Sequence, residues 1–384
     1  MWRTIISFIV IFSAVVSISA VSSRFWAGEQ EQQAEKMIVT VSEGMTVAEF
    51  GTKHDLDRNA LKRIFNLASP HELDKRVADF GMNQEVLGKK VNGILALQAE
   101  HASKNWFKIL AKGSLWAIFL LAVFVLLKRG KVTAQDRKWI YMAAVGLFGV
   151  FLGSDPSPMG TVKDAIVLLA SKGVVFPPRL IALTIFLLMS ILANKFICSW
   201  GCQVGTLQDL IFRLNRDSKD RKGLLGQVKI PFRISNSVRV FFFVLLVLAA
   251  FVWAMDIVET IDPFKIFKPR AVSMVGGFFV VSIMVLSLFT YRPWCHFFCP
   301  FGLVGWLAEK ISIFRMKVDY DKCVSCEACS KACPSTVMDA ILKRNRVIPD
   351  CFSCGTCMET CPAHAISFAR GPRPKPPEGK FDEQ

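Results

Sequence analysis

Long apolar runs separated by polar and basic segments dominate the first 300 residues of this chain. Six such runs cover approximately residues 4–21, 109–127, 139–153, 180–197, 238–255 and 271–289. Most of them approach the roughly 20 residues that a helix needs to cross a lipid bilayer, and the third is the shortest. Tryptophans lie near the ends of several runs, as they do at membrane–water interfaces. The pattern predicts a mainly α, polytopic transmembrane helical protein.

The composition agrees with a membrane protein, because 52% of the 384 residues are hydrophobic. The formal net charge is +16. In a membrane protein such a charge indicates topology and contact with anionic lipid. No basic patch interleaved with aromatic residues points to nucleic acid. We therefore expect membrane lipid as a partner and no nucleic acid.

Lysine and arginine are unevenly distributed among the loops. The loops at 128–138 and 213–239 are rich in both, whereas those at 154–179 and 256–270 are poorer and also carry carboxylates. The positive-inside rule makes the basic loops cytoplasmic, which predicts a bacterial cytoplasmic (inner) membrane protein with both chain ends inside. Residues 22–108 would then form a small helical domain in the periplasm, with docking of a partner as its expected role. Residues 1–21 fit either a membrane anchor or a signal peptide.

The chain contains a duplicated motif at the ends of two apolar runs. An Asp-Pro pair, then an apolar run, then Cys-x3-Cys-x2-Gly occurs twice, as "CSWGCQVG" and "CHFFCPFG". We expect the two cysteines of each pair to share one helical face. If the duplicated helices pack together, four thiols converge near the cytoplasmic surface: Cys198, Cys202, Cys295 and Cys299. A third iron–sulfur cluster, a redox-active dithiol, a zinc site and inert buried cysteines all fit this arrangement.

Eight further cysteines form two runs of Cys-x2-Cys-x2-Cys-x3-Cys-Pro, which is the spacing of bacterial two-cluster ferredoxins. In that pattern the fourth cysteine of each run binds the other cluster. One 4Fe-4S cluster is therefore assigned to Cys323, Cys326, Cys329 and Cys361. The second is assigned to Cys351, Cys354, Cys357 and Cys333. Zinc sites rarely use this spacing, and disulfides do not persist in the cytoplasm.

Several other redox and nucleotide motifs are absent from the sequence. None of the five histidines lies inside an apolar run, so the runs offer no histidine ligands for a pair of membrane b-type haems. The chain has no Walker loop and no Gly-x-Gly-x-x-Gly, so nothing indicates ATP or NAD chemistry. Electrons must therefore come from a membrane-soluble carrier or from partner proteins.

The two helix-end motifs followed by two ferredoxin runs resemble the NapH/NosR family of membrane-bound 4Fe-4S ferredoxin-like proteins. The resemblance covers roughly residues 139–368. It implies a quinol dehydrogenase membrane component, or another electron-transfer component, working between the quinone pool or a cytoplasmic donor and a periplasmic redox protein. It also implies that all twelve cysteines are relevant to redox chemistry. The first motif departs from the family pattern, since Gln203 stands where the family has proline.

These observations divide the chain into five segments. They are an anchor or signal at 1–21, a periplasmic helical domain at 22–108, a membrane domain at 109–312, a cytoplasmic two-cluster ferredoxin-like domain at 313–369 and a disordered tail at 370–384. We expect a membrane-bound iron–sulfur electron-transfer protein with two 4Fe-4S clusters, and a third cluster and a quinone as further candidates. The alternatives are an assembly or regulatory factor that supplies electrons or metal to a periplasmic metalloenzyme, and a scaffold whose clusters only stabilise the fold.

Overall fold

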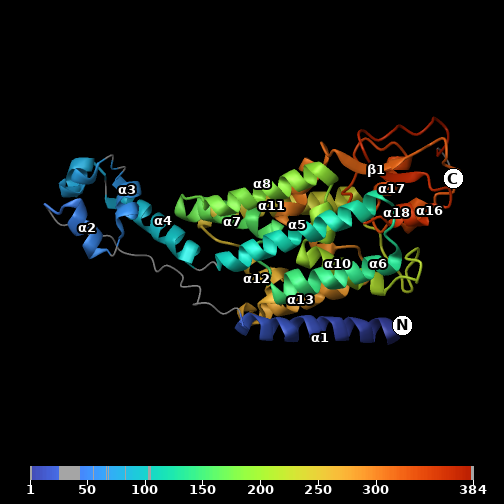
Figure 1. Ribbon diagram of the computed structural model, residues 1–384, viewed down its shortest axis with the longest axis horizontal. Helices are drawn as coiled ribbons and strands as arrows, with labels where there is room; N and C mark the ends of the chain where they lie inside the picture. The colour runs from blue at the N-terminus through green and yellow to red at the C-terminus, as the bar shows by residue number, and fades with distance from the viewer. Residues whose placement is uncertain are drawn as a thin grey trace.

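The computed structural model describes residues 2–25, 44–54, 56–65, 67, 69–82, 84–102 and 105–381. The chain is mainly helical, as predicted. Figure 1 shows a central bundle of helices, a C-terminal unit at one end of the bundle and a small unit formed by α2, α3 and α4 at the other end.

The predicted apolar runs are helical. Three helices are long and apolar enough to cross a membrane, namely α1 (Trp2–Phe25), α5 (Trp106–Lys128) and α11 (Phe232–Trp253). Two runs form the shorter apolar helices α8 (Pro177–Ala193) and α13 (Met274–Leu286). The run at 139–153 begins in α6 (Ala134–Ala144) and continues into the π-helical η3 (Val145–Phe151). The assignment of this chain as a membrane protein thus rests on the length and composition of its helices.

The duplicated motif is built from matching elements. The first copy contains α7 (Pro158–Lys172), α8, α9 (Phe196–Trp200) and α10 (Gln203–Leu214). The second follows α12 (Val258–Ile261) and contains η4 (Pro263–Phe267), η5 (Pro269–Ala271), α13, α14 (Pro293–Phe297) and α15 (Pro300–Glu309). In each copy an apolar helix ends, a residue with positive φ follows (Asn194 or Arg292), and a five-residue helix leads into the next helix.

The small unit has its own hydrophobic core. Its elements are α2 (Val47–Lys53), α3 (Arg58–Phe65), η1 (Pro70–Asp74), η2 (Val77–Phe80) and α4 (Gln84–Ala102). Val47, Phe50, Ile64 and Val91 are completely buried in this core. α4 also lies against α7 of the bundle.

The C-terminal unit is closed by a two-stranded antiparallel sheet. β1 (Phe314–Val318) pairs with β2 (Ile366–Arg370), with Phe314 opposite Arg370. Three short helices lie between the strands: α16 (Ala328–Ala332), α17 (Val337–Leu342) and α18 (Thr356–Thr360). The expectation of a disordered tail does not hold for residues 371–381, because they lie against this unit. Arg373 Nε donates to Met316 O at 3.2 Å, and Lys380 Nζ donates to Tyr320 O at 2.8 Å.

One continuous hydrophobic core joins the bundle to the C-terminal unit. Phe124 of α5 packs edge-on against Phe314 and Phe368, with ring centroids 5.2 and 5.6 Å away. The start of α1 lies at the same end of the bundle, where Thr4 Oγ1 donates to Leu214 O at 3.4 Å. The C-terminal unit is therefore packed onto the bundle and sits on the same side as the N-terminus (Figure 1).

Candidate functional site

The two four-cysteine runs share one backbone conformation. In each run the second and fourth residues after the first cysteine have positive φ: Ser325 and Glu327 in the first run, Ser353 and Gly355 in the second. Alternating left-handed residues turn successive amide groups towards the inside of a loop, which favours an anionic group there. The loops that the sequence predicts as cluster-binding therefore have a backbone conformation that suits an anionic group.

The structure groups the eight ferredoxin-type cysteines by the crossed pattern. A first hollow, with ≈ 350 Å³ of empty space, is lined by Cys323, Cys326, Cys329 and Cys361. A second, with ≈ 380 Å³, is lined by Cys333, Cys351, Cys354 and Cys357. The fourth cysteine of each run thus stands with the first three of the other run. All eight are free of disulfide bonds.

The duplicated motif forms a third hollow that is also lined by four cysteines. Its ≈ 330 Å³ of empty space is lined by Cys198, Cys202, Cys295 and Cys299. All four cysteines are buried and free of disulfide bonds. The two copies of the motif therefore bring their thiols together, although the four residues are up to about a hundred positions apart in the chain.

The expectation that the cysteines of each pair share one helical face is wrong. Cys198 and Cys295 lie in the short helices α9 and α14, whereas Cys202 and Cys299 are the N-cap residues of α10 and α15. The chain turns between the two cysteines, so they approach the hollow from different elements.

The matching glycines make this turn possible. A Cβ atom on Gly205 would lie 2.5 Å from the carbonyl oxygen of Cys198, and one on Gly302 would lie 2.5 Å from that of Cys295. Any side chain would therefore push the two cysteines of a pair apart.

Gln203 does not disturb the first copy of the turn. Gln203 and Pro300 both occupy the first position of the helix after the second cysteine, where a free backbone N–H is not needed. Cys202 (φ −73°, ψ 121°) and Cys299 (φ −69°, ψ 117°) have nearly the same conformation. The departure from the family pattern leaves the geometry of the first pair intact.

Two basic residues connect the copies and were not singled out in the sequence. Lys195 and Arg292 each stand three residues before the first cysteine of their own copy. Lys195 Nζ donates to Gly302 O, and Arg292 donates from one guanidinium nitrogen to Cys198 O at 2.7 Å. Each side chain thus holds the cysteine turn of the other copy. The sequence did offer a signal for these two residues, because both copies have a basic residue three positions before their first cysteine.

Each of these cations also reaches a buried carboxylate. Lys195 pairs with Asp350, which also accepts from Arg239 at 3.0 Å. Arg292 pairs with Asp209. Asp350 directly precedes Cys351, so the Lys195 pair also attaches the second ferredoxin run to the bundle.

Two arginines from the bundle donate hydrogen bonds to the second ferredoxin run. Arg137 Nε donates to Cys354 O at 2.8 Å, and Arg213 donates to Thr356 Oγ1 at 3.2 Å. Burial raises the pKa of Cys351 to about 12. Burial acts in the same direction on Cys354, but the guanidiniums of Arg213 and Arg137 outweigh it and lower the pKa of that thiol. This positive environment favours thiolate and an anionic group in the second hollow.

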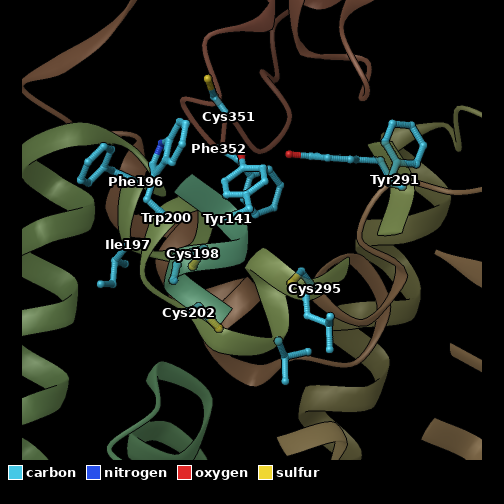
Figure 2. Close-up of a cluster of buried hydrophobic side chains, with 14 of the residues drawn as sticks. Tyr141, Phe196, Ile197, Cys198, Trp200, Cys202, Tyr291, Cys295, Cys351 and Phe352 are labelled. Atoms are coloured by element: carbon cyan, nitrogen blue, oxygen red, sulfur yellow. The ribbon is translucent and has the colours of Figure 1, made fainter. Parts of the chain in front are cut away.

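Phe352 separates the second hollow from the third and lines both of them. Its ring is buried, with the guanidinium of Arg292 at 4.6 Å and the ammonium of Lys195 at 5.5 Å from its centroid. Figure 2 shows Cys351 on one side of this aromatic group and Cys198, Cys202 and Cys295 on the other. One side chain therefore lies between two four-cysteine sites.

The donor sets fit clusters better than single ions. Among the residues that the structure describes, no three His, Cys, Asp or Glu side chains stand close enough to share one metal ion. A zinc ion draws its ligands to about 2.3 Å from a single centre. A 4Fe-4S cluster instead takes one thiolate on each of four irons, so its ligands line a hollow.

Comparisons with known proteins agree with this geometry. A model described as a 4Fe-4S dicluster domain matches residues 315–362, and one described as a 4Fe-4S binding domain matches residues 175–222 and 272–319. The second model thus matches both copies of the duplicated motif. No solved structure matches the chain significantly.

The chain is similar to several curated proteins. It is 28% identical to YccM of Escherichia coli over 167 residues, which are 41% of this chain and 46% of that protein. It is 28% identical to the ferredoxin-type protein NapH of Escherichia coli over 184 residues (45% and 60%). It is 24% identical to the regulatory protein NosR of Pseudomonas aeruginosa over 167 residues (41% and 22%). The chain therefore spans less than two thirds of each of these relatives.

The apolar helices and the four-cysteine sites define a membrane protein of the iron–sulfur, ferredoxin-like class. The relatives of this chain include proteins named NapH and NosR, which agrees with the resemblance that the sequence motifs indicated.

Proposed function

We propose that this protein transfers electrons through three iron–sulfur clusters, from its C-terminal unit into the membrane bundle. The observation that carries the proposal is the presence of three hollows that are each lined by four cysteines. The same set of four soft ligands favours the same type of group in all three. When bound, the clusters supply one-electron chemistry, and the chain positions them and excludes water.

The walls of the third hollow support a path that continues towards the other end of the bundle. Phe352 contributes from the C-terminal unit, whereas Met159 at the start of α7 and Phe264 in η4 contribute from segments that follow the two Asp-Pro pairs. α7 then leads to Phe176, which lines a pocket together with Ile94 of the small unit. We propose that the C-terminal unit is cytoplasmic, that the small unit is periplasmic and that electrons pass between the two sides.

The partners follow from this arrangement and from the resemblance. We propose the quinone pool or a cytoplasmic donor at one end of the path and a periplasmic redox protein at the other. The relatives named NapH carry the words "ferredoxin-type protein", which agrees with electron transfer.

The test is an EPR-monitored redox titration with iron and sulfide analysis. The parent protein is compared with a variant in which Cys198, Cys202, Cys295 and Cys299 are changed to serine. We expect three paramagnetic centres and about twelve irons in the parent, and two centres and about eight irons in the variant. Equal iron in the two folded proteins would remove the third cluster from the proposal.

A second candidate is a regulatory or assembly factor, favoured by the name "regulatory protein" of the NosR relatives. Anaerobic addition of a quinol analogue separates the two functions. Rapid reduction of the clusters supports a quinol-linked electron-transfer protein. Clusters that dithionite reduces and no quinol reduces contradict the quinol-linked function.

A further inference from the structure

Two hydroxyl groups lie beside cysteine sulfurs of the second hollow. Thr356 Oγ1 is 3.5 Å from Cys354 Sγ, and Ser335 Oγ is 3.6 Å from Cys333 Sγ. All four residues line this hollow. A cysteine that binds iron has lost its thiol proton, so the hydroxyl is the donor in both pairs when a cluster is bound.

The first hollow has alanine at both of the equivalent positions. Thr356 stands two residues after the second cysteine of its run, where the other run has Ala328. Ser335 stands two residues after the fourth cysteine of its run, where the other run has Ala363, which lines the first hollow. Because the fourth cysteines are exchanged between the hollows, both alanines belong to the first cluster. The two sites therefore share one cysteine pattern and differ in these two hydroxyl donors.

The surroundings of Thr356 direct its proton to the sulfur. Its oxygen accepts a hydrogen bond from Arg213 at 3.2 Å, which leaves the hydroxyl proton for another acceptor. Asp220 Oδ2 is 3.4 Å away, which is long for an O–H···O bond, and it already accepts from Arg137 at 2.7 Å. Bonds to the larger sulfur atom are longer, so Cys354 Sγ at 3.5 Å is the better placed acceptor.

The arginines beside the second run act in the same direction, but carboxylates share their charge. Arg137 pairs with Asp220 and Glu359. Arg213 pairs with Asp209 and Asp220. The hydroxyl groups therefore give the clearer difference between the two sites.

Hydrogen bonds to the sulfurs of a cluster raise its reduction potential. The sulfurs become more negative when the cluster gains an electron, so a donor stabilises the reduced form more than the oxidised form. Backbone amides donate at both hollows, as Ala365 N does to Cys361 Sγ at 3.3 Å and Ser353 N does to Cys351. The hydroxyl donors come in addition to the amides at the second hollow.

We propose that Thr356 and Ser335 give the second cluster a higher reduction potential than the first, so that electrons pass from the first cluster to the second. One electron leaves the reduced first cluster and reduces the second, and no bond or proton is exchanged. Cys326 of the first hollow is exposed, so a donor protein can approach there, whereas the second run is hydrogen-bonded to the bundle. Both hydroxyl residues are positioning residues, because they act through cysteine sulfurs and do not bind iron. The inference rests on the two ferredoxin-type clusters of the proposed function and does not need the third.

The test is an EPR-monitored redox titration of the full-length holoprotein, in which each substitution identifies its own centre. Thr356→Val keeps the side-chain volume and removes the hydroxyl, and Ser335→Ala removes the other one. Both should shift the midpoint potential of the same centre to a more negative value. Thr356→Ser keeps a hydroxyl and should retain the parent potential. Ala363→Ser adds a hydroxyl at the first hollow and should shift a different centre to a more positive value.

Thr360→Val is the matched control. Thr360 lies in the same helix as Thr356, donates to the carbonyl oxygen of Thr356 at 2.9 Å and lines none of the three hollows. This control should leave every potential unchanged. In the parent protein, the centre that responds to Thr356→Val should have the higher midpoint potential of the two identified centres.

The opposite order of potentials would overturn the inference and leave the clusters of the proposed function in place. Unchanged potentials in Thr356→Val and Ser335→Ala, with both clusters assembled, would have the same consequence. If the parent holds no ferredoxin-type centre, the proposed function fails as well. If Thr356→Val does not assemble its cluster, the shifts in Ser335→Ala and Ala363→Ser decide.

Discussion

Lys195 and Arg292 occupy the same position in the two copies of the duplicated motif, and each donates to a backbone carbonyl of the other copy. The two cysteine turns are therefore braced reciprocally. Because Lys195 also pairs with Asp350 and Arg292 with Asp209, the braces are part of buried ion pairs. The Lys195–Asp350 pair also joins the first copy to the C-terminal unit, whereas the Arg292–Asp209 pair joins the two copies to each other.

Replacing Lys195 by methionine should destabilise the protein strongly. The change leaves the carboxylate of Asp350 buried with less positive charge, and removing one partner of a buried pair typically costs about 3–5 kcal/mol. We expect a clear fall in the thermal unfolding midpoint in detergent. Lys343→Met is the control, because Lys343 is 54% exposed and its pair with Asp339 should contribute about 0–1 kcal/mol. Equal effects of the two substitutions would contradict a structural role for the brace.

Alanine at Gly205 or Gly302 should reduce the iron content selectively. The new Cβ would lie 2.5 Å from a cysteine carbonyl oxygen, so the turn that aims two thiols into the third hollow must open. Iron analysis should show the loss of one cluster, with the two ferredoxin-type signals retained. Gly226→Ala adds a Cβ that meets nothing within 4 Å and should keep all the iron. Full iron in all three variants would show that the turn tolerates a side chain.

The carboxyl of Asp262 should give the protein a pH-dependent stability. Burial raises the pKa of Asp262 to about 6, although Lys163 and the Phe264 amide lower it. The folded state then holds a proton that the unfolded state, with a pKa of about 3.9, releases. Stability from this group is present below about pH 4 and is lost as the pH rises through about 6.

The measurement is the unfolding midpoint of the parent and of Asp262→Asn between pH 4 and pH 7. Asparagine keeps the oxygen that accepts from Phe264 N, so the cap of η4 is retained. We expect the parent to lose stability relative to the variant as the pH rises. Parallel curves would contradict the raised pKa. The quantity to compare is the difference in unfolding midpoint between parent and variant at each pH. Nearby Glu259 changes the midpoint of both proteins in the opposite direction, because Lys265 and Lys163 lower its pKa against the effect of burial.

The two ends of the bundle should face opposite sides of the membrane. A cysteine introduced at Lys75, which is 53% exposed in the small unit, should react with a membrane-impermeant maleimide added to intact spheroplasts. A cysteine at Lys343 in the C-terminal unit should react only after the membrane is opened. The parent protein, treated in the same way, shows how much label its own twelve cysteines take up. Labelling of both sites from outside would overturn the proposed topology.

Much of the fold and of the site could be predicted from local patterns. Apolar runs predicted the helices because the length of such a run is itself the physical requirement for spanning a bilayer. The ferredoxin-type spacing predicted the crossed grouping of Cys333 and Cys361, since a loop of that length can place three thiols around one cluster. The prediction that Cys198 and Cys202 share a helical face failed because Gly205 lets the chain turn between them.

The sequence by itself determined the class of protein, the twelve cysteines and the duplication, because these depend on composition and on short, repeated spacings. Only the tertiary structure decided what lies between distant segments. Arg137 and Arg213, which counted towards topology as basic loop residues, are buried against the second ferredoxin run. Phe352 lies between two hollows, and Lys195 crosses from one copy to the other. Such contacts join residues more than a hundred positions apart, and no local pattern specifies which distant partner satisfies a buried charge.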